Sequence, residues 1–116
     1  ARQTSLLILK KFSRCKTVAN TFRFDRNGGG IEYYATLYSE DHRFLHSSLF
    51  SAETIVDKVG SGDCFMAGLI YGLYNHWPEK QIIQFAAAAA FGKFMETGDA
   101  TNQDLETIQT RATQYA

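Results

Sequence analysis

Proline and cysteine are scarce in this sequence, which has one proline and two cysteines in 116 residues. Cys15 and Cys64 stand in no CxxC or Cys/His ligand spacing, so neither a disulfide framework nor a zinc site is expected. Reduced thiols in a cytoplasmic protein fit this pattern best. The longest uncharged apolar run, residues 64–74, is too short for a bilayer, which takes about 20 helical residues to cross. No signal-peptide pattern stands at the start of the chain. We therefore expect no membrane partner.

Net charge is lacking as well, because twelve basic residues balance twelve acidic ones. Without a basic excess the chain has no overall electrostatic footprint for nucleic acid, and nucleic-acid binding is not expected. A hydrophobic fraction of 45% excludes a disordered segment and predicts one globular domain, or one piece of a larger domain. Basic residues gather in the first 26 positions, and we interpret them as a solvated helix face that runs into a loop.

Hydrophobic periodicity predicts a first half that is rich in strands. Alternating and β-branched stretches lie on either side of a run of three glycines, which is typical of strands joined by a turn. The expected elements of this half are, in order, a helix at 5–12, strands at 18–22 and 31–38, a turn at 39–42, a returning arm of that hairpin at 43–50, a break at 51–53 and a short strand at 55–56.

The second half is predicted to be helical, with helices at 64–75, 79–96 and 105–115. The first of them carries almost no charge, which favours burial on most sides. Its Gly68 and Gly72 are interpreted as allowing close contact with the sheet. The second contains five consecutive alanines, a composition with high helix propensity, and Gly98 is expected to stop it. Thr101 or Asn102 is expected to cap the third.

A glycine-rich loop, residues 57–63, joins the short strand to the first of these helices. Glycines 60 and 62 let successive N–H groups point into one concavity, and the start of the helix adds the positive end of its dipole, so the loop is suited to an anion. Asp63 places a carboxylate at the mouth of that site. Phosphoryl transfer explains it: the carboxylate accepts the proton of the attacking hydroxyl while the N–H groups stabilise the transferring charge. From the loop alone, Asp63 as a simple N-cap of the helix explains the residue equally well.

Other glycine motifs fail on inspection. No Gly-Lys-Ser/Thr triplet occurs, which excludes a Walker loop. A dinucleotide fingerprint counted from Gly60 requires glycine where Phe65 stands. Ser61 lacks the glycine spacing of a nucleophile elbow, because Val59 and Asp63 stand two residues to either side of it.

The segment from Asp57 to Gly68, DKVGSGDCFMAG, resembles the C-terminal signature of the ribokinase-like (PfkB) carbohydrate kinases, usually written D-T-x-G-A-G-D-x-F-x-A-G. Most signature positions match in register, namely Asp57, Gly60, Gly62, Asp63, Phe65, Ala67 and Gly68. The alanine-rich stretch and the segment at 98–101 look like the region that follows in the family. The resemblance implies the C-terminal part of a three-layer α/β/α fold.

The resemblance also implies the chemistry of the site. Asp63 is the expected catalytic base, and the amides of Gly60, Ser61, Gly62 and Asp63 are the expected anion hole. ATP with Mg²⁺ is the expected phosphoryl donor. The residues expected near the nucleotide are Ala87, Ala90, Gly98 and Asn102. The family often binds a monovalent cation such as K⁺ beside the loop, and the matching ligands are the Asp57 carboxylate and the Val59 carbonyl.

Two departures from the family pattern bear on the substrate. Lys58 replaces a small hydroxyl residue, and residues 20–23 stand where many members have a glycine-containing nucleotide loop. Together with residues 55–60, this looks most like the 2-keto-3-deoxygluconate kinase branch, so a sugar or sugar acid is the expected acceptor. Lys58 and Arg23 either help to hold a phosphate or sugar acid or are solvated loop charges.

The resemblance covers nearly the whole chain but only about the last third of a typical family member. The sugar-binding part is expected to precede residue 1, so we expect the isolated chain to be inactive, to expose apolar surface and to self-associate. A second hypothesis is a non-catalytic nucleotide-binding or assembly module in which Asp63 only caps a helix.

Overall fold

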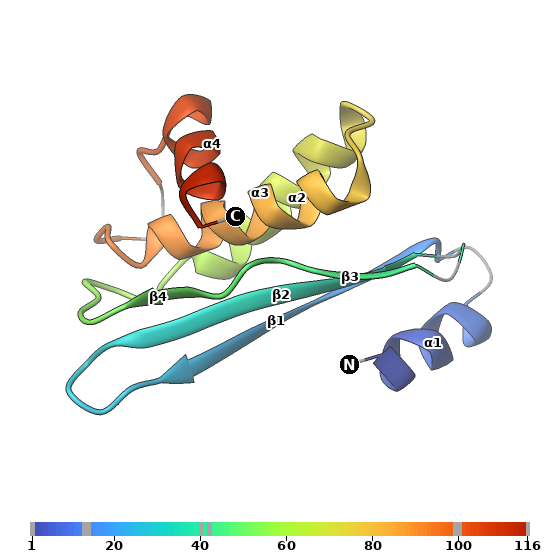
Figure 1. The fold of residues 1–116 in the computed structure, drawn as a ribbon, viewed down its shortest axis with the longest axis horizontal. Helices are drawn as coiled ribbons and strands as arrows, with labels where there is room; N and C mark the ends of the chain where they lie inside the picture. The colour runs from blue at the N-terminus through green and yellow to red at the C-terminus, as the bar shows by residue number, and fades with distance from the viewer. Residues whose placement is uncertain (1, 13–14, 40, 42, 99–100, 116) are drawn as a thin grey trace.

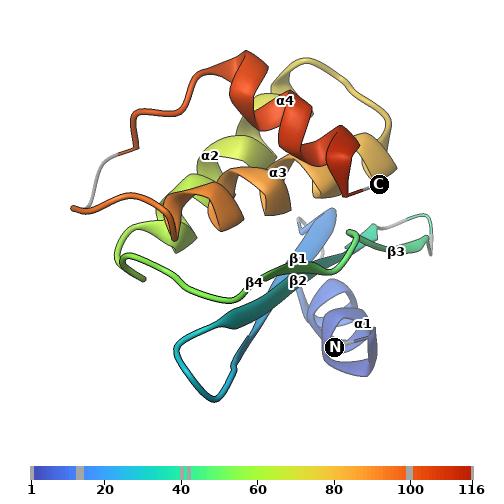
Figure 2. The ribbon, with the colours of Figure 1, turned by 60° about the vertical axis from the view of Figure 1, so that its left-hand side comes forward.

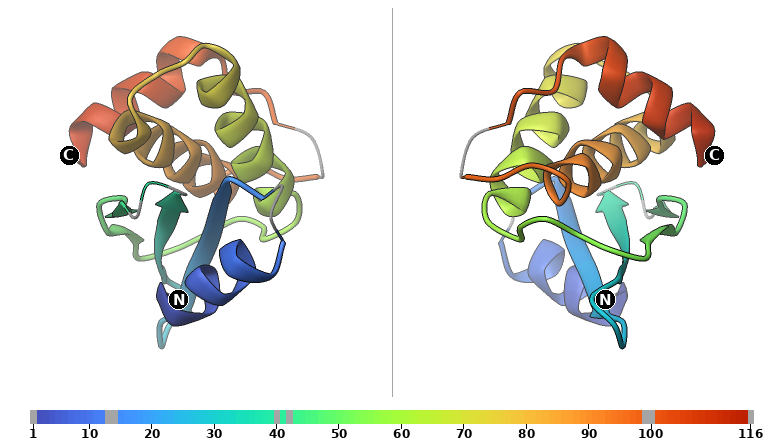
Figure 3. Two further views of the ribbon diagram at one scale, coloured as in Figure 1. Left: turned by 90° about the vertical axis from the view of Figure 1, so that its right-hand side faces the viewer. Right: turned by 90° about the vertical axis from the view of Figure 1, so that its left-hand side faces the viewer.

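A four-stranded antiparallel sheet lies between helices in the computed structural model of this protein, which describes residues 2–12, 15–39, 41, 43–98 and 101–115. Helix α1 contacts one face of the sheet and α3 the other, while α2 and α4 pack against α3 (Figures 1 and 3). The elements follow in chain order as α1 (Arg2–Lys11), β1 (Thr17–Asp25), β2 (Ile31–Ser39), β3 (Phe44–His46), β4 (Phe50–Ala52), α2 (Ser61–Tyr74), α3 (Glu79–Lys93) and α4 (Leu105–Gln114). The predicted α/β class, with strands before the main helices, is confirmed.

The β1–β2 hairpin is the longest strand pair of the sheet, and the two strands pair along their whole length. Gly28 and Gly29 in the connecting turn have φ angles of 92° and 97°, which glycine adopts without a steric penalty. Strand β2 is central, with β1 on one side and both β3 and β4 on the other. Both predicted strands are confirmed, and β1 is longer than expected.

The returning arm of the hairpin is divided into two short strands instead of the single one expected at 43–50. Thr36 of β2 faces His46 of β3, but Tyr33 faces Phe50 of β4, so the return strand carries one extra residue and forms a bulge. Buried Ser47 fills the break, because its Oγ accepts a hydrogen bond from the N–H of Ala35 at 2.9 Å while its own N–H donates to the Ala35 carbonyl at 2.8 Å.

The break expected at 51–53 is therefore wrong for its first two residues, which belong to β4. The predicted strand at Ile55–Val56 is also wrong. Val56 is a bend whose N–H donates to the carbonyl of Phe94 at 2.7 Å, so this apolar pair is tied to the end of α3 and adds no strand. In the turn expected at 39–42, residues 40 and 42 lie outside the described residues.

The ends of the last two helices differ from the predictions. Helix α3 begins after Pro78 as expected but ends at Lys93, well before Gly98, which has a φ of 84° in the following loop. Helix α4 is capped by Asp104, whose carboxylate accepts from the N–H of Thr107 at 2.8 Å, and not by the two residues predicted from the sequence. An N-cap carboxylate satisfies a backbone donor that the helix itself leaves free.

Helices α2 and α3 approach each other closely through small residues (Figure 2). A Cβ atom built on Gly68 would lie 2.9 Å from Cα of Ala86, and one built on Gly72 would lie 2.9 Å from Cγ1 of Ile82. The two glycines of α2 thus serve a helix-to-helix contact. The interpretation that they face the sheet is wrong, because the atoms nearest to a Cβ on either glycine belong to α3.

One face of α2 is open to solvent, which contradicts the expected burial on most sides. Met66, Ile70, Leu73 and Tyr74 are between 41% and 81% exposed. Their spacing of three to four residues makes them one apolar stripe. This stripe is the kind of exposed apolar surface that we expected on the isolated chain, and self-association through it remains a prediction.

Among the described residues, none of the helices combines the length and the apolar character that crossing a membrane requires. Cys15 and Cys64 are both free thiols.

Candidate functional site

The first turn of α2 is built on a glycine with a left-handed backbone. Gly60 is the N-cap residue, with φ of 84° and ψ of −2°, and it makes no side-chain capping bond. A side chain at this φ would be strained, so glycine suits the position. Asp63 is the third residue of the helix and not its cap. The alternative in which Asp63 is the N-cap is therefore wrong.

The predicted anion hole has its donors free. No described residue accepts a hydrogen bond from the N–H groups of Gly60, Ser61, Gly62 or Asp63; the first amide of the turn that is engaged belongs to Cys64, which donates to the Gly60 carbonyl at 3.1 Å. Free donors at a helix start, with the positive end of the dipole, favour a bound anion. The Asp63 side chain is exposed beside them. The structure thus brings the four residues of the predicted catalytic loop into one turn.

The Asp57 carboxylate ties this loop to the segment after α3. Its Oδ1 accepts from the N–H of Val59 at 3.2 Å, and its Oδ2 accepts from the N–H of Gly98 at 3.3 Å. These backbone donors, with Val59 the stronger, hold the pKa of Asp57 below its usual value. The N–H of Asp57 donates in turn to the Phe94 carbonyl at 3.2 Å. The loop before α2 and the loop after α3 therefore form one linked unit.

Lys58 pairs with a residue at the end of β1. Its Nζ lies 2.9 Å from Oδ1 of Asp25, and this hydrogen bond lowers the pKa of that carboxyl group. Both side chains are largely exposed, so the pair adds little stability. Of the two readings of Lys58 made from the sequence, the solvated loop charge matches this contact. Arg23 is exposed on β1.

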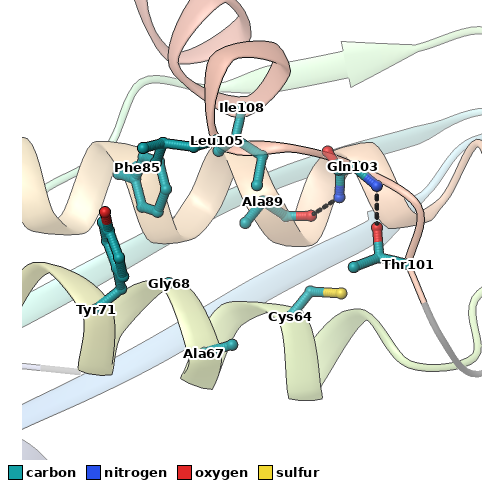
Figure 4. A pocket seen from close by; sticks show the side chains of 10 residues that line it. All are labelled: Cys64, Ala67, Gly68, Tyr71, Phe85, Ala89, Thr101, Gln103, Leu105 and Ile108. Atoms are coloured by element: carbon teal, nitrogen blue, oxygen red, sulfur yellow. Dashed lines mark hydrogen bonds between the residues drawn. The ribbon is translucent and has the colours of Figure 1, made fainter.

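An apolar groove of about 240 Å³ begins at the first turn of α2 and runs along this helix (Figure 4). One wall comes from α2, the floor from α3, and the other wall from α4 and the loop before it. The residues that line it are Cys64, Ala67, Gly68, Tyr71, Phe85, Ala89, Thr101, Gln103, Leu105 and Ile108. Cys64, which lines the groove, belongs to the same first turn of α2 as the free amides.

Hydrogen bonds from Gln103 and Arg111 to α3 hold the outer wall of the groove in place. The side-chain amide of Gln103 donates to the Ala89 carbonyl at 2.9 Å (Figure 4), and Arg111 donates both to the Ala88 carbonyl and to the Oε1 atom of Gln103. Gly92 leaves the room for this contact, since a Cβ there would collide with both side chains. Polar groups from three segments thus fix the width of the groove.

The four residues predicted to contact a nucleotide are separated by the fold. Ala87 and Ala90 of α3 are fully buried in the core, which also contains Phe94, the residue after this helix, whose ring contacts Tyr33 of β2. They form the layer behind the groove, and Ala89 presents its side chain to the groove in their place. Gly98 and Asn102 are exposed in the loop between α3 and α4.

Sequence reasoning did not find the aromatic part of the groove. Tyr71 and Phe85 stack with their ring centroids 5.9 Å apart, and Trp77 meets both rings edge-on. The apolar spacing along α2 pointed to a packed helix, and only the approach of α4 shows that one side of it lines a cavity. Positions 99 and 100 lie outside the described residues, so the predicted segment at 98–101 is only partly described.

The described residues contain no cluster of three or more histidine, cysteine, aspartate or glutamate side chains placed to hold a metal. Magnesium in nucleotide-dependent enzymes is held by one or two carboxylates together with the phosphates of the nucleotide, and keeps several waters. A single exposed carboxylate next to free amides, as at Asp63, is compatible with a Mg²⁺ ion that is carried by the nucleotide.

Comparison with known proteins gives one consistent family. A family model described as pfkB family carbohydrate kinase matches residues 34–105. A 5-dehydro-2-deoxygluconokinase of Geobacillus kaustophilus is 40% identical over 53 residues, which are 46% of this chain and 16% of that protein. The match to this relative therefore spans a small part of its length.

Two solved structures extend the likeness to nearly the whole chain. The 2-dehydro-3-deoxygluconokinase of Thermotoga maritima is 27% identical, with a TM-score of 0.89 over 97% of this chain and 33% of that one. A PfkB family carbohydrate kinase of Listeria grayi is 25% identical, with a TM-score of 0.87 over 93% of this chain and 33% of that one. The chain thus spans about a third of the length of these two proteins.

Proposed function

This chain belongs to the pfkB family of carbohydrate kinases, and we propose that it is the C-terminal, catalytic and nucleotide-binding part of an ATP-dependent kinase for 2-keto-3-deoxygluconate. In this proposal the sugar-binding part lies in a preceding segment of the same protein. The acceptor is a sugar-acid hydroxyl, and the products are ADP and a phosphorylated sugar acid.

The proposal rests chiefly on one observation: free backbone amides and an exposed carboxylate meet in the first turn of α2. The amides of Gly60, Ser61 and Gly62 stabilise the negative charge that builds on the transferring phosphoryl group. Asp63 accepts the proton of the attacking hydroxyl. A carboxylate repels a phosphate, so its place beside an anion site is best explained by this transfer of a proton.

In the proposal ATP lies along α2, with its phosphates at the first turn and its adenine in the apolar groove. The helix rises about 1.5 Å per residue, so Gly68 lies about 10 Å from Ser61 along the axis. Apolar and aromatic walls suit a purine ring, and Tyr71 and Phe85 offer faces or edges to it. Gly98 and Asn102, in the loop between α3 and α4, are the proposed neighbours of the nucleotide.

Mg²⁺, when bound with the nucleotide, neutralises charge on the transferring phosphates. The residue of this chain that we propose to face it is Asp63. The remaining ligands in the proposal are phosphate oxygens and water, as is usual for this ion.

Two keto-deoxy sugar acids are candidate substrates. The similarity to the Thermotoga maritima 2-dehydro-3-deoxygluconokinase covers nearly the whole chain and supports the first candidate. The similarity to the Geobacillus kaustophilus 5-dehydro-2-deoxygluconokinase is higher in identity but covers less than half of the chain. We therefore retain 5-dehydro-2-deoxygluconate as the second candidate.

The function is tested by coupled ADP-release assays on the complete protein that contains this sequence. We expect turnover with 2-keto-3-deoxygluconate and ATP, and a kcat/KM at least about tenfold lower with neutral hexoses, because discrimination of that size needs only about 1.4 kcal/mol. The purified 116-residue chain is expected to show no sugar-dependent turnover. ATP binding by the complete protein without turnover on either sugar acid would contradict the proposal and favour a nucleotide-binding module.

The groove can be tested separately through Ala67, which lines it from an exposed position on α2. An Ala67→Trp change fills the groove with an indole without entering the core. We expect the KM for ATP to rise about tenfold or more, corresponding to about 1.4 kcal/mol of lost binding, with kcat changed far less.

Ala67→Ser is the matched control, because serine is close to alanine in volume and leaves the groove open. It should keep the KM for ATP within about twofold of the original value. An equal KM for ATP in the tryptophan variant would place the adenine elsewhere.

A further inference from the structure

Lys93 is a buried lysine next to the catalytic loop. It is the last residue of α3, and none of its surface is exposed to solvent. Its Nζ donates to the carbonyl of Glu96 at 3.0 Å. An ammonium group loses its hydration on burial and normally requires charged partners or several acceptors, so the one carbonyl bond found among the described residues is little compensation. The burial of this ammonium group is therefore unfavourable by itself, and the loop around it must supply the reason for it.

The loop that wraps around Lys93 closes on Asp57. At its start the Phe94 carbonyl accepts from the N–H of Asp57, and at its end the N–H of Gly98 donates to the Asp57 carboxylate. Glu96, whose carbonyl holds the ammonium, lies between these two ties. The ammonium group is therefore enclosed by the same loop that positions Asp57 beside the anion hole.

The charge of Lys93 acts on two groups near this loop, the carboxylate of Asp57 and the thiol of Cys64. It makes the smallest contribution among the groups that lower the pKa of Asp57, after the backbone bonds from Val59, Gly98 and Lys58. It also opposes the burial that raises the pKa of the Cys64 thiol in the first turn of α2. The ammonium thus lies in the electrostatic reach of Asp57 and of the start of α2.

The oxygen atoms around Asp57 do not fit a bound metal cation. Both carboxylate oxygens already accept backbone N–H groups, the Phe94 carbonyl accepts two, and the Glu96 carbonyl accepts the ammonium. A hard cation takes a shell of about six to eight oxygens, as Ca²⁺ does. The Phe94 carbonyl has both lone pairs engaged by N–H groups, and the Glu96 carbonyl already faces a positive charge. Among the described residues, the K⁺ ion expected beside Asp57 and Val59 from the family resemblance therefore lacks these two carbonyls as ligands.

We propose that the Lys93 ammonium group takes the place of a bound monovalent cation beside the catalytic loop, so that the enzyme works without K⁺. This inference rests on the proposed kinase function. Lys93 acts as a positioning residue: it holds the loop after α3, and with it Asp57, and its charge favours phosphate at the amides of the α2 start. Being fully buried, it does not touch the substrate.

The first test compares the complete enzyme in about 0.1 M tetramethylammonium chloride and about 0.1 M KCl, so that screening is equal. We expect kcat and the KM for ATP to agree within about twofold between the two salts. Activation by K⁺ of about fivefold or more, saturating with concentration, would overturn the proposal. This comparison needs no variant, so it stands even if changes at Lys93 prevent folding.

The second test is a rescue experiment with Lys93→Met, which keeps the length and apolar stem of the side chain but removes the charge. In tetramethylammonium we expect kcat/KM for ATP to fall about tenfold or more, and KCl to restore most of it. Lys93→Arg keeps the charge and should remain independent of K⁺. A loss in Lys93→Met that K⁺ does not relieve would show a structural role only and would overturn the proposal.

A readout without turnover separates this inference from the kinase assignment. Thermal melting in the two salts is expected to show a K⁺-dependent stabilisation of Lys93→Met and none of the original protein, because a ligand that binds only the folded state raises its stability. If the protein proves to lack kinase activity, this melting pattern still decides whether Lys93 stands in for a cation. Equal K⁺ stabilisation of both proteins would contradict it.

Discussion

Replacing Asp63 by asparagine is expected to lower kcat of the complete enzyme about 10²–10⁴-fold, the usual contribution of a positioned general base. Asparagine has the shape of aspartate but cannot take the proton of the attacking hydroxyl. The KM for ATP should stay within about threefold, since the amides of the α2 turn are unchanged. Because Asp63→Asn also removes a negative charge near the phosphates, the affinity for ATP without Mg²⁺, measured by calorimetry, should be equal or higher.

The matched control for this change is Glu106→Gln. Glu106 is an exposed carboxylate in the first turn of α4, as Asp63 is in the first turn of α2. Both changes remove the favourable interaction of a carboxylate with a helix N-terminus, worth about 0.3–1 kcal/mol. Only Asp63→Asn should reduce turnover. If the two variants show the same activity, Asp63 serves α2 alone and the kinase mechanism is wrong.

The helix start that carries the proposed catalytic loop could be predicted because its signal is local in the chain. Glycines 60 and 62, the carboxylate at position 63 and the start of a helix are consecutive, so one short window contains the proposed anion hole and the proposed base. The choice between base and N-cap was not local, since it depended on the backbone angle at Gly60. That angle makes Gly60 the cap and leaves Asp63 exposed in the first turn.

The strand pairing after the hairpin could not be predicted from periodicity. Residues 43–50 have the composition of one strand, but the hydroxyl of Ser47 takes the place of a backbone acceptor for the N–H of Ala35 where the strand bulges. Ile55 and Val56 are apolar and β-branched, which favours a strand. A strand must pair with the edge of a sheet, however, and the backbone of this segment is bound instead to the carbonyl of Phe94. Local propensity was overridden by long-range hydrogen bonds in both places.

The groove was missed for the same physical reason. Its walls come from α2, α3 and a loop near Gln103, and the hydrogen bonds that bring them together join side chains to backbone carbonyls of another helix. No motif with a fixed spacing encodes such a contact. The alanine run indicated that another element packs closely on α3, but not which alanine faces the groove and which faces the sheet.

The second large effect is expected for Gly68→Val, at the closest point between α2 and α3. Even the first side-chain atom would lie 2.9 Å from Cα of Ala86, a backbone atom that cannot rotate away. Valine adds two further carbons, so α2 must move off α3 and open the core contact of Phe65 and Leu69. Overpacking of this kind costs about 1–3 kcal/mol or more, against a total stability of about 5–15 kcal/mol.

Gly62→Val in the first turn of the same helix is the control for Gly68→Val. A Cβ at Gly62 meets no atom within 4 Å, so the same substitution should change the free energy of unfolding by less than about 0.5 kcal/mol. Urea denaturation of the two variants measures the difference. We expect Gly62→Val to fold normally but to lose turnover, because its side chain stands among the amides of the anion hole, and Gly68→Val to lose stability first and activity with it. Equal stability of the two proteins would show that the α2–α3 contact is looser than its glycines indicate, and the groove along α2 would then have no fixed width with which to select a nucleotide.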